Sequence, residues 1–426
     1  MDHVSGLKCL ICGAVYGADP TLYVCPKHGD DGILDVQYDY DQIKTRISPR
    51  ALQGAGPRSM WRYAPLLPVD PRALGELQHV GPPVHPLWSV GWTPLYRSPR
   101  LSGRLGLAEV YVKNDGAMPS ASLKDRASAI AILRALELGQ KVIAAASTGN
   151  AASSLATLSA SLGISNVIFV PAAAPSAKIA QLQVYGAKVL AVDGTYDQAF
   201  DLCLAASRAY GWYNRNTGYN PYMSEGKKTA SYEICEQLGW KAPDRIFVSV
   251  GDGCIIGGLY KGLKDMLELG WIQHIPRLMG VQAAGSAALY SAWTGHIAPL
   301  DMTLIEAHTV ADSISAGLPR DRIKAMRAVL ETDGAFVSVT DEEILSSIPI
   351  LAREAGVFAE PAGAAPYAGL VQAISLGMVA KHERVVVLVT GNGLKDVASA
   401  MKAVGRPAVI KPTLEAVDGA LKMMLT

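Results

Sequence analysis

Residues 142–150 read Val-Ile-Ala-Ala-Ala-Ser-Thr-Gly-Asn, and an alanine- and leucine-rich segment, 151–162, follows directly. The run 142–146 is short and continuously apolar, which is typical of a parallel strand buried on both faces. The segment 151–162 has the pattern of a helix, and Gly149 marks the turn between the two. A strand that turns into a helix is the unit of an open α/β sheet, whose ligands bind at the carboxyl ends of the strands. This stretch therefore predicts both the fold class and the edge of the sheet where a site lies.

The same alternation recurs along the chain from about residue 91. Further strands are expected at 110–113, 167–171, 188–192, 246–250, 278–281 and 385–389. Further helices are expected at 125–138, 177–185, 226–238 and 341–354, the last with capping-box spacing from Thr340. The prediction is an α/β protein with two open, mostly parallel twisted sheets that carry helices on both faces.

The texture of the sequence divides the chain into four parts. A small turn-rich unit, 1–45, comes first, and a proline-rich arm, 46–90, follows it. We expect the arm to drape over a larger body, because a proline-rich segment cannot join a central sheet. The remainder is predicted to form a large domain from 91–125 and 211–426, with a small α/β domain, 126–210, inserted into it.

The N-terminal unit holds a pattern with the spacing of a metal site. Cys9, Cys12, Cys25 and His28 form the arrangement C-x₂-C-x₁₂-C-x₂-H. This spacing is typical of structural zinc, and a unit of this size needs a staple to fold firmly. The alternative is a degenerate ribbon held together by packing alone, and neither reading implies a catalytic metal.

Composition excludes several classes of protein. The 426 residues carry a formal net charge of +1, which gives no electrostatic reason to expect nucleic acid or an anionic membrane as a partner. No apolar run is long enough to span a bilayer, and the first residues lack the pattern of a signal peptide. The other cysteines, Cys203, Cys235 and Cys254, are scattered, which argues against a disulfide framework and favours a reducing cytoplasm.

Two of the predicted strand-to-helix turns carry side chains with distinctive chemistry. Lys124 stands at a helix start, where the positive helix end and burial both disfavour its ammonium form. A neutral amine is what an imine-forming nucleophile requires. Asn150 follows the next strand, and its amide can bond a ring hydroxyl. Alone, Lys124 would be interpreted as a solvated lysine, and Ser147, Thr148 or Asn150 as a helix cap.

Two later strand ends complete the set. The glycine turn after strand 246–250 presents backbone N–H groups that suit a phosphate, from Gly251, Asp252, Gly253, Cys254 and Ile255. Thr390 ends strand 385–389 with a hydroxyl that can face a heterocyclic nitrogen. Their ordinary alternatives are tight packing and helix capping. Together the four strand ends supply a covalent anchor, a ring-oxygen partner, a phosphate site and a ring-nitrogen partner, which predicts a pyridoxal-phosphate enzyme acting on an amino acid.

The order and wording of these motifs resemble the tryptophan-synthase-β (fold type II) family of pyridoxal-phosphate enzymes, and within it the threonine synthases. The resemblance extends from Gly91 to Asp396 and rests on segments 91–95, 99–102, 113–116, 119–126, 147–150, 220–222, 225–229, 358–365 and 390–396. The last, Thr-Gly-Asn-Gly-Leu-Lys-Asp, is particularly typical of threonine synthases. The N-terminal unit is similar to the zinc-ribbon-like start of the plant-type members.

The resemblance implies a carbon–oxygen lyase that converts O-phosphohomoserine and water to threonine and phosphate by γ-elimination and β-addition. Lys124 would then be the Schiff-base lysine and the general acid and base, Asn150 the partner of the ring hydroxyl, and Thr390 that of the pyridine nitrogen. The amides of 251–255 would hold the cofactor phosphate. A homodimer is also implied. Contacts with a phosphorylated amino-acid substrate are expected from Asn114, Ser120, Ser122, Ser147, Thr148, Lys178 and Asn220.

The chain departs from the family pattern where the substrate is selected. The family's Thr-Gly-Ser-Phe is Ser-Ala-Ser-Leu at 120–123, and Met223 replaces an arginine that often follows Asn-Pro-Tyr. Arg126 and Lys178 are candidate replacements for that cation. The turn 251–255 is closer to that of serine/threonine dehydratases. Dehydration of serine or threonine, and β-replacement on O-phosphoserine as in cysteate synthases, therefore stay open. A non-catalytic regulator that binds a metabolite is disfavoured, because Lys124, Asn150 and Thr390 are all retained.

Overall fold

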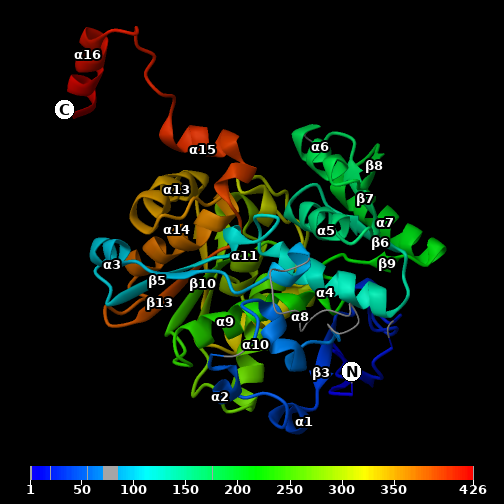
Figure 1. The fold of residues 1–426 in the computed structure, drawn as a ribbon. Coiled ribbons are helices and arrows are strands. Elements are labelled where there is room, and N and C mark those ends of the chain that lie inside the picture. The colour runs from blue at the N-terminus through cyan, green and yellow to red at the C-terminus, as the bar shows by residue number, and fades with distance from the viewer. Residues whose placement is uncertain (1, 20, 55, 71–84, 175, 426) are drawn as a thin grey trace.

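Two central sheets organise the computed structural model, which describes residues 2–19, 21–54, 56–70, 85–174 and 176–425 (Figure 1). The larger sheet has the strand order β12-β11-β10-β13-β5-β4. Its strands are β4 (Leu95–Arg97), β5 (Glu109–Asn114), β10 (Arg245–Ser249), β11 (Arg277–Ala283), β12 (Ala335–Val339) and β13 (Arg384–Val389). The edge strand β4 is antiparallel to β5, whereas the other neighbours are parallel. The sheet is therefore mixed, with its parallel part in the interior.

The smaller sheet is parallel throughout and has the order β8-β7-β6-β9. It is built from β6 (Val142–Ala146), β7 (Ser165–Pro171), β8 (Lys188–Val192) and β9 (Tyr213–Asn214). Because Tyr213 pairs with Ile143 of β6, the predicted domain boundary at residue 211 needs correction. The two residues of β9 belong with the small sheet and are too few to produce a periodic pattern.

Helices pack on both sheets and account for most of the remaining chain. Around the small sheet lie α4 (Lys124–Glu137), α5 (Asn150–Ala160), α6 (Ser176–Val184) and α7 (Tyr196–Tyr210). Around the large sheet lie α3 (Pro99–Leu105), α8 (Met223–Lys227), α9 (Thr229–Gln237), α10 (Cys254–Glu268), α11 (Ala288–Thr294), α12 (Arg322–Leu330), α13 (Asp341–Ala355) and α14 (Pro361–Ser375). The chain continues into α15 (Val397–Val404) and α16 (Leu414–Leu425), and α16 projects away from the body (Figure 1).

The predicted α/β alternation is confirmed, with three differences in detail. The predicted helix 226–238 is divided into α8 and α9 at Lys228. The strands β4 and β12 were not predicted: β4 is a three-residue edge strand, and β12 has a serine within its five residues. The capping box at Thr340 is present, since its hydroxyl and the Glu343 side chain bond each other's backbone N–H.

A small antiparallel sheet near the N-terminus docks onto the large unit. It has the order β2-β1-β3, from β1 (Val4–Cys9), β2 (Val15–Tyr16) and β3 (Leu34–Tyr38). The Tyr38 hydroxyl donates to Glu225 (2.5 Å), and the ammonium of Lys228 bonds both Glu225 (2.7 Å) and Asp265 (2.8 Å). These groups are buried, so a polar cluster rather than a purely apolar surface holds the small sheet in place.

The described part of the proline-rich arm enters the core. The helix α1 (Tyr40–Lys44) precedes the arm, which contains α2 (Pro49–Leu52) and the 3₁₀ helices 60–66 and 86–89. Trp61 and Tyr63 are buried, and the Tyr63 ring lies 5.1 Å from that of Tyr232 on α9. The expectation that the arm merely drapes over a larger body is therefore corrected for these residues, because its aromatic side chains supply core packing. Residues 71–84 of the predicted arm lie outside the described residues.

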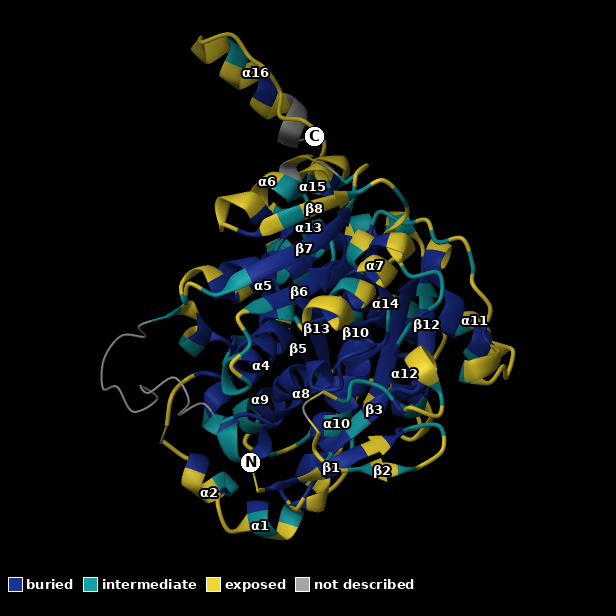
Figure 2. Ribbon diagram, turned by 90° about the vertical axis from the view of Figure 1, so that its right-hand side faces the viewer, coloured by how far each residue is buried: buried dark blue, intermediate teal, exposed yellow. Residues whose placement is uncertain are grey.

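Burial follows the sheets. Figure 2 shows most strands of the two central sheets in the colour of buried residues, whereas the edge strand β8, the outer helices and α16 carry exposed residues. Within the described ranges, no helix combines the length and the apolar composition needed to cross a membrane.

A fully buried ion network joins the start of α4 to the large sheet. The Arg126 guanidinium contacts Asp115 (2.8 Å) and Glu233 (2.6 Å), and Glu233 also pairs with Lys113 (2.7 Å). All four side chains have 0% exposed surface. Lys113 lies on β5, Glu233 on α9 and Arg126 on α4, so the network links a strand and two helices close to Lys124.

Replacing Arg126 with Met is expected to lower the free energy of unfolding by about 3–5 kcal/mol, because two carboxylates would stay buried without their cation. Urea unfolding followed by circular dichroism measures this. Lys44→Met, which removes only an exposed pair with Asp41, is the control. An Arg126 variant as stable as the control would contradict the importance of the network.

Candidate functional site

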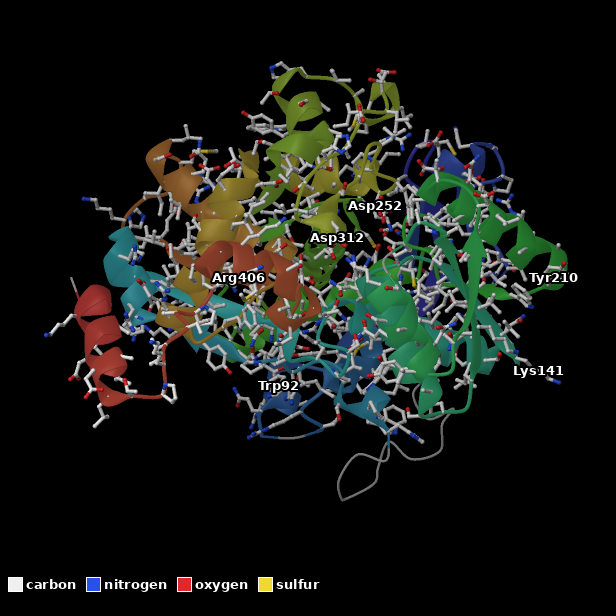
Figure 3. All side chains as sticks on the ribbon, turned by 90° about the horizontal axis from the view of Figure 1, so that it is seen from above. Trp92, Lys141, Tyr210, Asp252, Asp312 and Arg406 are labelled. Atoms are coloured by element: carbon white, nitrogen blue, oxygen red, sulfur yellow. The ribbon has the colours of Figure 1, made fainter. Side chains whose placement is uncertain are left out.

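A cavity of about 870 Å³ lies where the carboxyl ends of β6 and β10 meet the starts of α4, α5 and α10. Its walls come from both central sheets, and Asp252 and Asp312, which line it, lie near the middle of the molecule in Figure 3. Residues that follow two separate strands, β6 and β10, therefore line one cavity together with Lys124.

The N-terminal unit supplies part of the cavity wall. Asp30 and Asp31 both line it. Asp30 pairs with Arg208 on α7 (2.9 Å), and Asp31 pairs with Arg322 on α12 (2.7 Å). Asp30 thus contacts a helix beside the small sheet, and Asp31 contacts a helix beside the large sheet.

Lys124 is the first residue of α4 and lines the cavity. The turn before it contains Ala121 at φ 62°, a left-handed conformation that L-residues other than glycine seldom adopt. Backbone bonds hold this turn: the Leu123 N–H donates to the Thr390 carbonyl (2.9 Å) and the Asn392 N–H to the Ala121 carbonyl (3.0 Å). Burial lowers the pKa of Lys124 to about 8, and the charges of Lys227 and Arg215 act in the same direction. A neutral amine is therefore accessible just above neutral pH.

Asn150 begins α5 and also lines the cavity. Its amide Nδ2 donates to Glu360 Oε1 (2.7 Å) and to Ser313 Oγ (3.3 Å). Glu360 is buried, and burial raises its pKa to about 7. A Cβ atom at Gly391 would lie 2.0 Å from Glu360 Oε1, so only glycine fits there. Asn150 is thus oriented by a carboxyl group that the sequence prediction did not include.

The turn Gly251–Ile255 forms another wall, and all five residues line the cavity. The helix α10 starts at Cys254 without a side-chain cap, so its first-turn N–H groups have no partner within the helix. Gly253 has φ 94°, and a Cβ at Gly251 would lie 2.8 Å from Ile314 Cα. The Asp252 carboxylate accepts from the Arg320 N–H (3.3 Å), and burial raises the pKa of Asp252, which limits its negative charge.

The other predicted residues divide into two groups. Ser147 and Thr148 line the cavity, and Ser122 accepts from the Lys124 N–H (3.2 Å). Thr390 does not line the cavity. Its hydroxyl lies 3.5 Å from the hydroxyl of Ser249, and Ser249 does line the cavity.

Five of the seven expected substrate contacts, Ser122 included, are not among the residues that line the cavity. Ser120 bonds the buried Asp125, and Lys178 pairs with Asp312. The Asn220 amide donates to the Asn214 carbonyl (2.7 Å) and its Oδ1 accepts from Tyr222 (2.9 Å), whereas Asn114 ends β5 beside Gly116. The candidate cation Arg126 is held in its ion network.

The structure adds three residues that the sequence interpretation did not assign to the site: Glu360, Arg215 and Lys227. Glu360 and Lys227 stand inside two segments that carry the family resemblance, 358–365 and 225–229, and this was the available signal for them. Arg215 had none, because it follows a two-residue strand in a polar segment.

The four metal-like residues of the N-terminal unit are brought together. One ligand atom from each of Cys9, Cys12, Cys25 and His28 lies within 4.8 Å of all the others. Cys9 Sγ is 3.8 Å from His28 Nδ1, and Cys12 Sγ is 4.0 Å from Cys25 Sγ. Ligands of a tetrahedral zinc with bonds of about 2.0–2.3 Å are separated by roughly 3.5–3.8 Å, close to these distances.

Comparison with known families identifies the kind of protein. The family model described as "Pyridoxal-phosphate dependent enzyme" matches residues 88–391, which include the residues of all four predicted strand ends. The chain belongs to this family. It is an enzyme of the pyridoxal-phosphate dependent class, as the motifs predict, and the α/β architecture is that of its fold type II members.

Individual relatives agree with this assignment. The chain is 39% identical to a threonine synthase of Methanosarcina acetivorans, over 97% of this chain and 98% of that protein. It is 36% identical to a threonine synthase of Methanocaldococcus jannaschii, over 97% and 99%. The predicted resemblance to threonine synthases is therefore confirmed. A solved threonine deaminase isoform from Solanum lycopersicum shares the fold with a TM-score of 0.62 at 23% identity, over 74% of this chain and 83% of that one.

Replacing Glu360 with Gln is expected to change how stability depends on pH. The carboxyl has a pKa of about 7 in the folded protein and an ordinary value of 4.5, so between these limits only the folded state binds the proton. Stability from this group is complete below pH 4.5 and is lost as pH rises through 7. The Gln variant should therefore be more stable than the unmodified protein at pH 8, by up to about 3 kcal/mol, and nearly equal to it at pH 5.

Urea titrations at both pH values, with the exposed Glu342→Gln as control, measure this difference. Equal slopes of stability against pH in the two variants would show that Glu360 is ionised throughout.

Proposed function

We propose that the chain catalyses the threonine-synthase reaction, in which O-phosphohomoserine and water give threonine and phosphate. The observation that carries this proposal is the near-full-length match to two threonine synthases. The reactive lysine lies in a cavity lined with hydroxyls, exposed helix N–H groups and cations, which suits a small, anionic amino acid. We also propose a homodimer and a cytoplasmic location.

The residues around the cavity fit the family's cofactor. The uncapped start of α10 and the turn 251–255 offer N–H groups to a phosphate, where a side chain at Gly251 would be excluded by Ile314. Lys124 supplies an amine of lowered pKa for covalent attachment. Asn150 would meet the ring hydroxyl, and Thr390, behind Ser249, the ring nitrogen. When bound, pyridoxal phosphate withdraws electrons from the carbons of the attached amino acid and so makes their protons removable.

The chain's own groups would bind the substrate and move its protons. The start of α5, with Ser147 and Thr148, presents N–H and O–H donors suited to the substrate carboxylate. Once released from the cofactor, the neutral Lys124 amine would take the proton from the α-carbon and later return it. The hydroxyl at Thr390 carries no charge, so it would limit electron build-up on the ring nitrogen. That environment suits elimination and replacement over transamination.

A substrate panel on the purified holo-protein tests the proposal. O-phosphohomoserine should yield threonine and phosphate in equal amounts, whereas serine and threonine should give little keto acid. Keto acid from the unphosphorylated amino acids would instead indicate a dehydratase, and β-replacement on O-phosphoserine a cysteate-synthase-like enzyme. No turnover of any substrate would favour a metabolite-binding regulator.

Lys124→Ala should reduce kcat by about 10³-fold or more, because both the anchor and the proton-transfer group are lost. Borohydride treatment of the unmodified holo-protein should attach a pyridoxyl group to the peptide that contains residue 124. In the cofactor-free protein, the rate of attachment should rise as pH increases through about 8, where the amine becomes neutral. A pyridoxyl label on another lysine would refute the assigned role.

We further propose that Cys9, Cys12, Cys25 and His28 bind a structural zinc. The convergence of four ligand atoms within 4.8 Å supports this, and so does the size of the unit. The neighbouring Asp30 and Asp31 connect the unit to the cavity wall, but none of the four ligands lines the cavity itself.

Purified protein should contain about one zinc per chain, and removal of the metal by a chelator should lower Tm by several degrees, since metal binding contributes to folding. Cys12→Ser, at the exposed ligand, should show the lower Tm and no further response to chelator. Atomic emission and thermal denaturation measure both effects. A metal-free preparation with unchanged Tm would favour a ribbon held by packing alone.

A further inference from the structure

Two buried cations in the cavity wall lack an acidic partner. Arg215 and Lys227 are each 1% exposed, and both line the cavity. Arg215 Nε donates to the Ser128 hydroxyl (3.2 Å), and Arg215 Nη1 and Lys227 Nζ both donate to Thr217 Oγ1 (3.4 and 3.3 Å). The Lys227 side chain also bonds the Cys254 thiol at the start of α10. Arg215 Nη2 has no partner in the described chain.

Other buried cations of the described chain are paired. Lys113, Arg126 and Lys228 contact carboxylates with no exposed surface. Four others pair with carboxylates that are partly exposed: Arg134 with Glu137, Arg245 with Glu383, Arg322 with Asp31 and Lys324 with Asp35. Burying a charge without a counter-charge is costly, so an unpaired pair of cations is typical of a site for an anionic ligand.

The two cations converge on one point close to the reactive amine. Both reach the same hydroxyl, that of Thr217, which also lines the cavity. Both act on the titration of Lys124, so they lie within electrostatic range of its amine. A guanidinium and an ammonium around one hydroxyl form a small, doubly positive site, which matches a phosphate monoester dianion.

We propose that Arg215 and Lys227 bind the phosphate group of the substrate. This inference rests on the proposed function and names the residues that recognise the leaving group. Arg215 and Lys227 would also replace the arginine that the family often has where this chain has the buried Met223. The two other candidate cations are paired with carboxylates, Arg126 with Asp115 and Glu233, and Lys178 with Asp312. Phosphate leaving from the γ-carbon would depart as an anion already neutralised by these two charges.

The cofactor carries a phosphate too, and the same cations have the chemistry to bind it. The turn 251–255 and the uncapped start of α10 already provide an anion site of N–H groups on the large sheet. Arg215, in contrast, follows β9 on the small sheet, and its N–H donates to the Ala144 carbonyl of β6 (2.9 Å). The placement of Arg215 favours the substrate phosphate, whereas Lys227 also contacts Cys254 of the turn. Measurement of cofactor affinity separates the two sources.

The test compares Arg215→Met and Lys227→Met with Lys141→Met, an exposed lysine at the edge of the molecule in Figure 3. In phosphate-free buffer, inorganic phosphate should raise the Tm of the unmodified holoenzyme and of the Lys141 variant, but not of the other two. Each cavity variant should raise KM for O-phosphohomoserine and Ki for inorganic phosphate at least tenfold, with cofactor Kd changed less than twofold. Arg215→Lys should restore part of the phosphate affinity.

Several results would overturn the inference. Loss of cofactor affinity in parallel with phosphate affinity would assign the cations to the cofactor instead. Unchanged Ki and KM in both cavity variants would show that neither cation binds the substrate phosphate. If Arg215→Met does not fold, Lys227→Met and Arg215→Lys carry the same comparison. Phosphate binding that depends on Arg215, in a holoenzyme that does not turn over O-phosphohomoserine, would support the anion site and reject the proposed reaction.

Discussion

The buried contact between Arg126 and its two carboxylates fixes the helix on which the reactive lysine stands. Lys124 and Arg126 are two residues apart at the start of α4, so any shift of this helix would move both. Asp115 follows β5, and Glu233 lies on α9, which ties the helix start to the large sheet. The backbone bonds from Leu123 and Asn392 add β13 and its following loop to the same junction. We interpret the network as a device that selects one geometry, since buried ion pairs contribute more to specificity than to net stability.

The cations near the cavity fall into two electrostatic classes, and the difference explains the chemistry of the amine. The Arg126 and Lys113 charges are neutralised by adjacent carboxylates. Those of Arg215 and Lys227 are not, so they add to the effect of burial and favour the uncharged form of Lys124. Burial raises the pKa of Asp252 and that of Glu360, while the Asp252 charge opposes the lowering of the Lys124 pKa. Burial and these two unpaired cations together favour a neutral amine at Lys124.

Most of the fold was predictable because buried parallel strands have a clear pattern, whereas short edge strands do not. The continuous apolar runs that became β6, β10 and β13 were recognised from sequence, while the two residues of β9 were not. Residues of the site that end long strands or begin helices, such as Lys124 and Asn150, were predicted from that position. Ser120 and Asn220 were also expected at the site, but local hydrogen bonds engage them elsewhere. Arg215 escaped prediction because the absence of a counter-charge is a property of the folded surroundings.

The neighbouring carboxylates of Asp30 and Asp31 have a consequence for how the cavity admits a ligand. One is attached to α7 beside the small sheet and the other to α12 beside the large sheet. A hinge motion that separates the two sheets must therefore either break one of these ion pairs or carry the N-terminal segment along with one side. The exposed ion pair between Arg208 and Asp30 is the weaker of the two, because water and salt screen it. A segment distant in sequence from the reactive lysine thus links helices on both sides of the cavity by ion pairs.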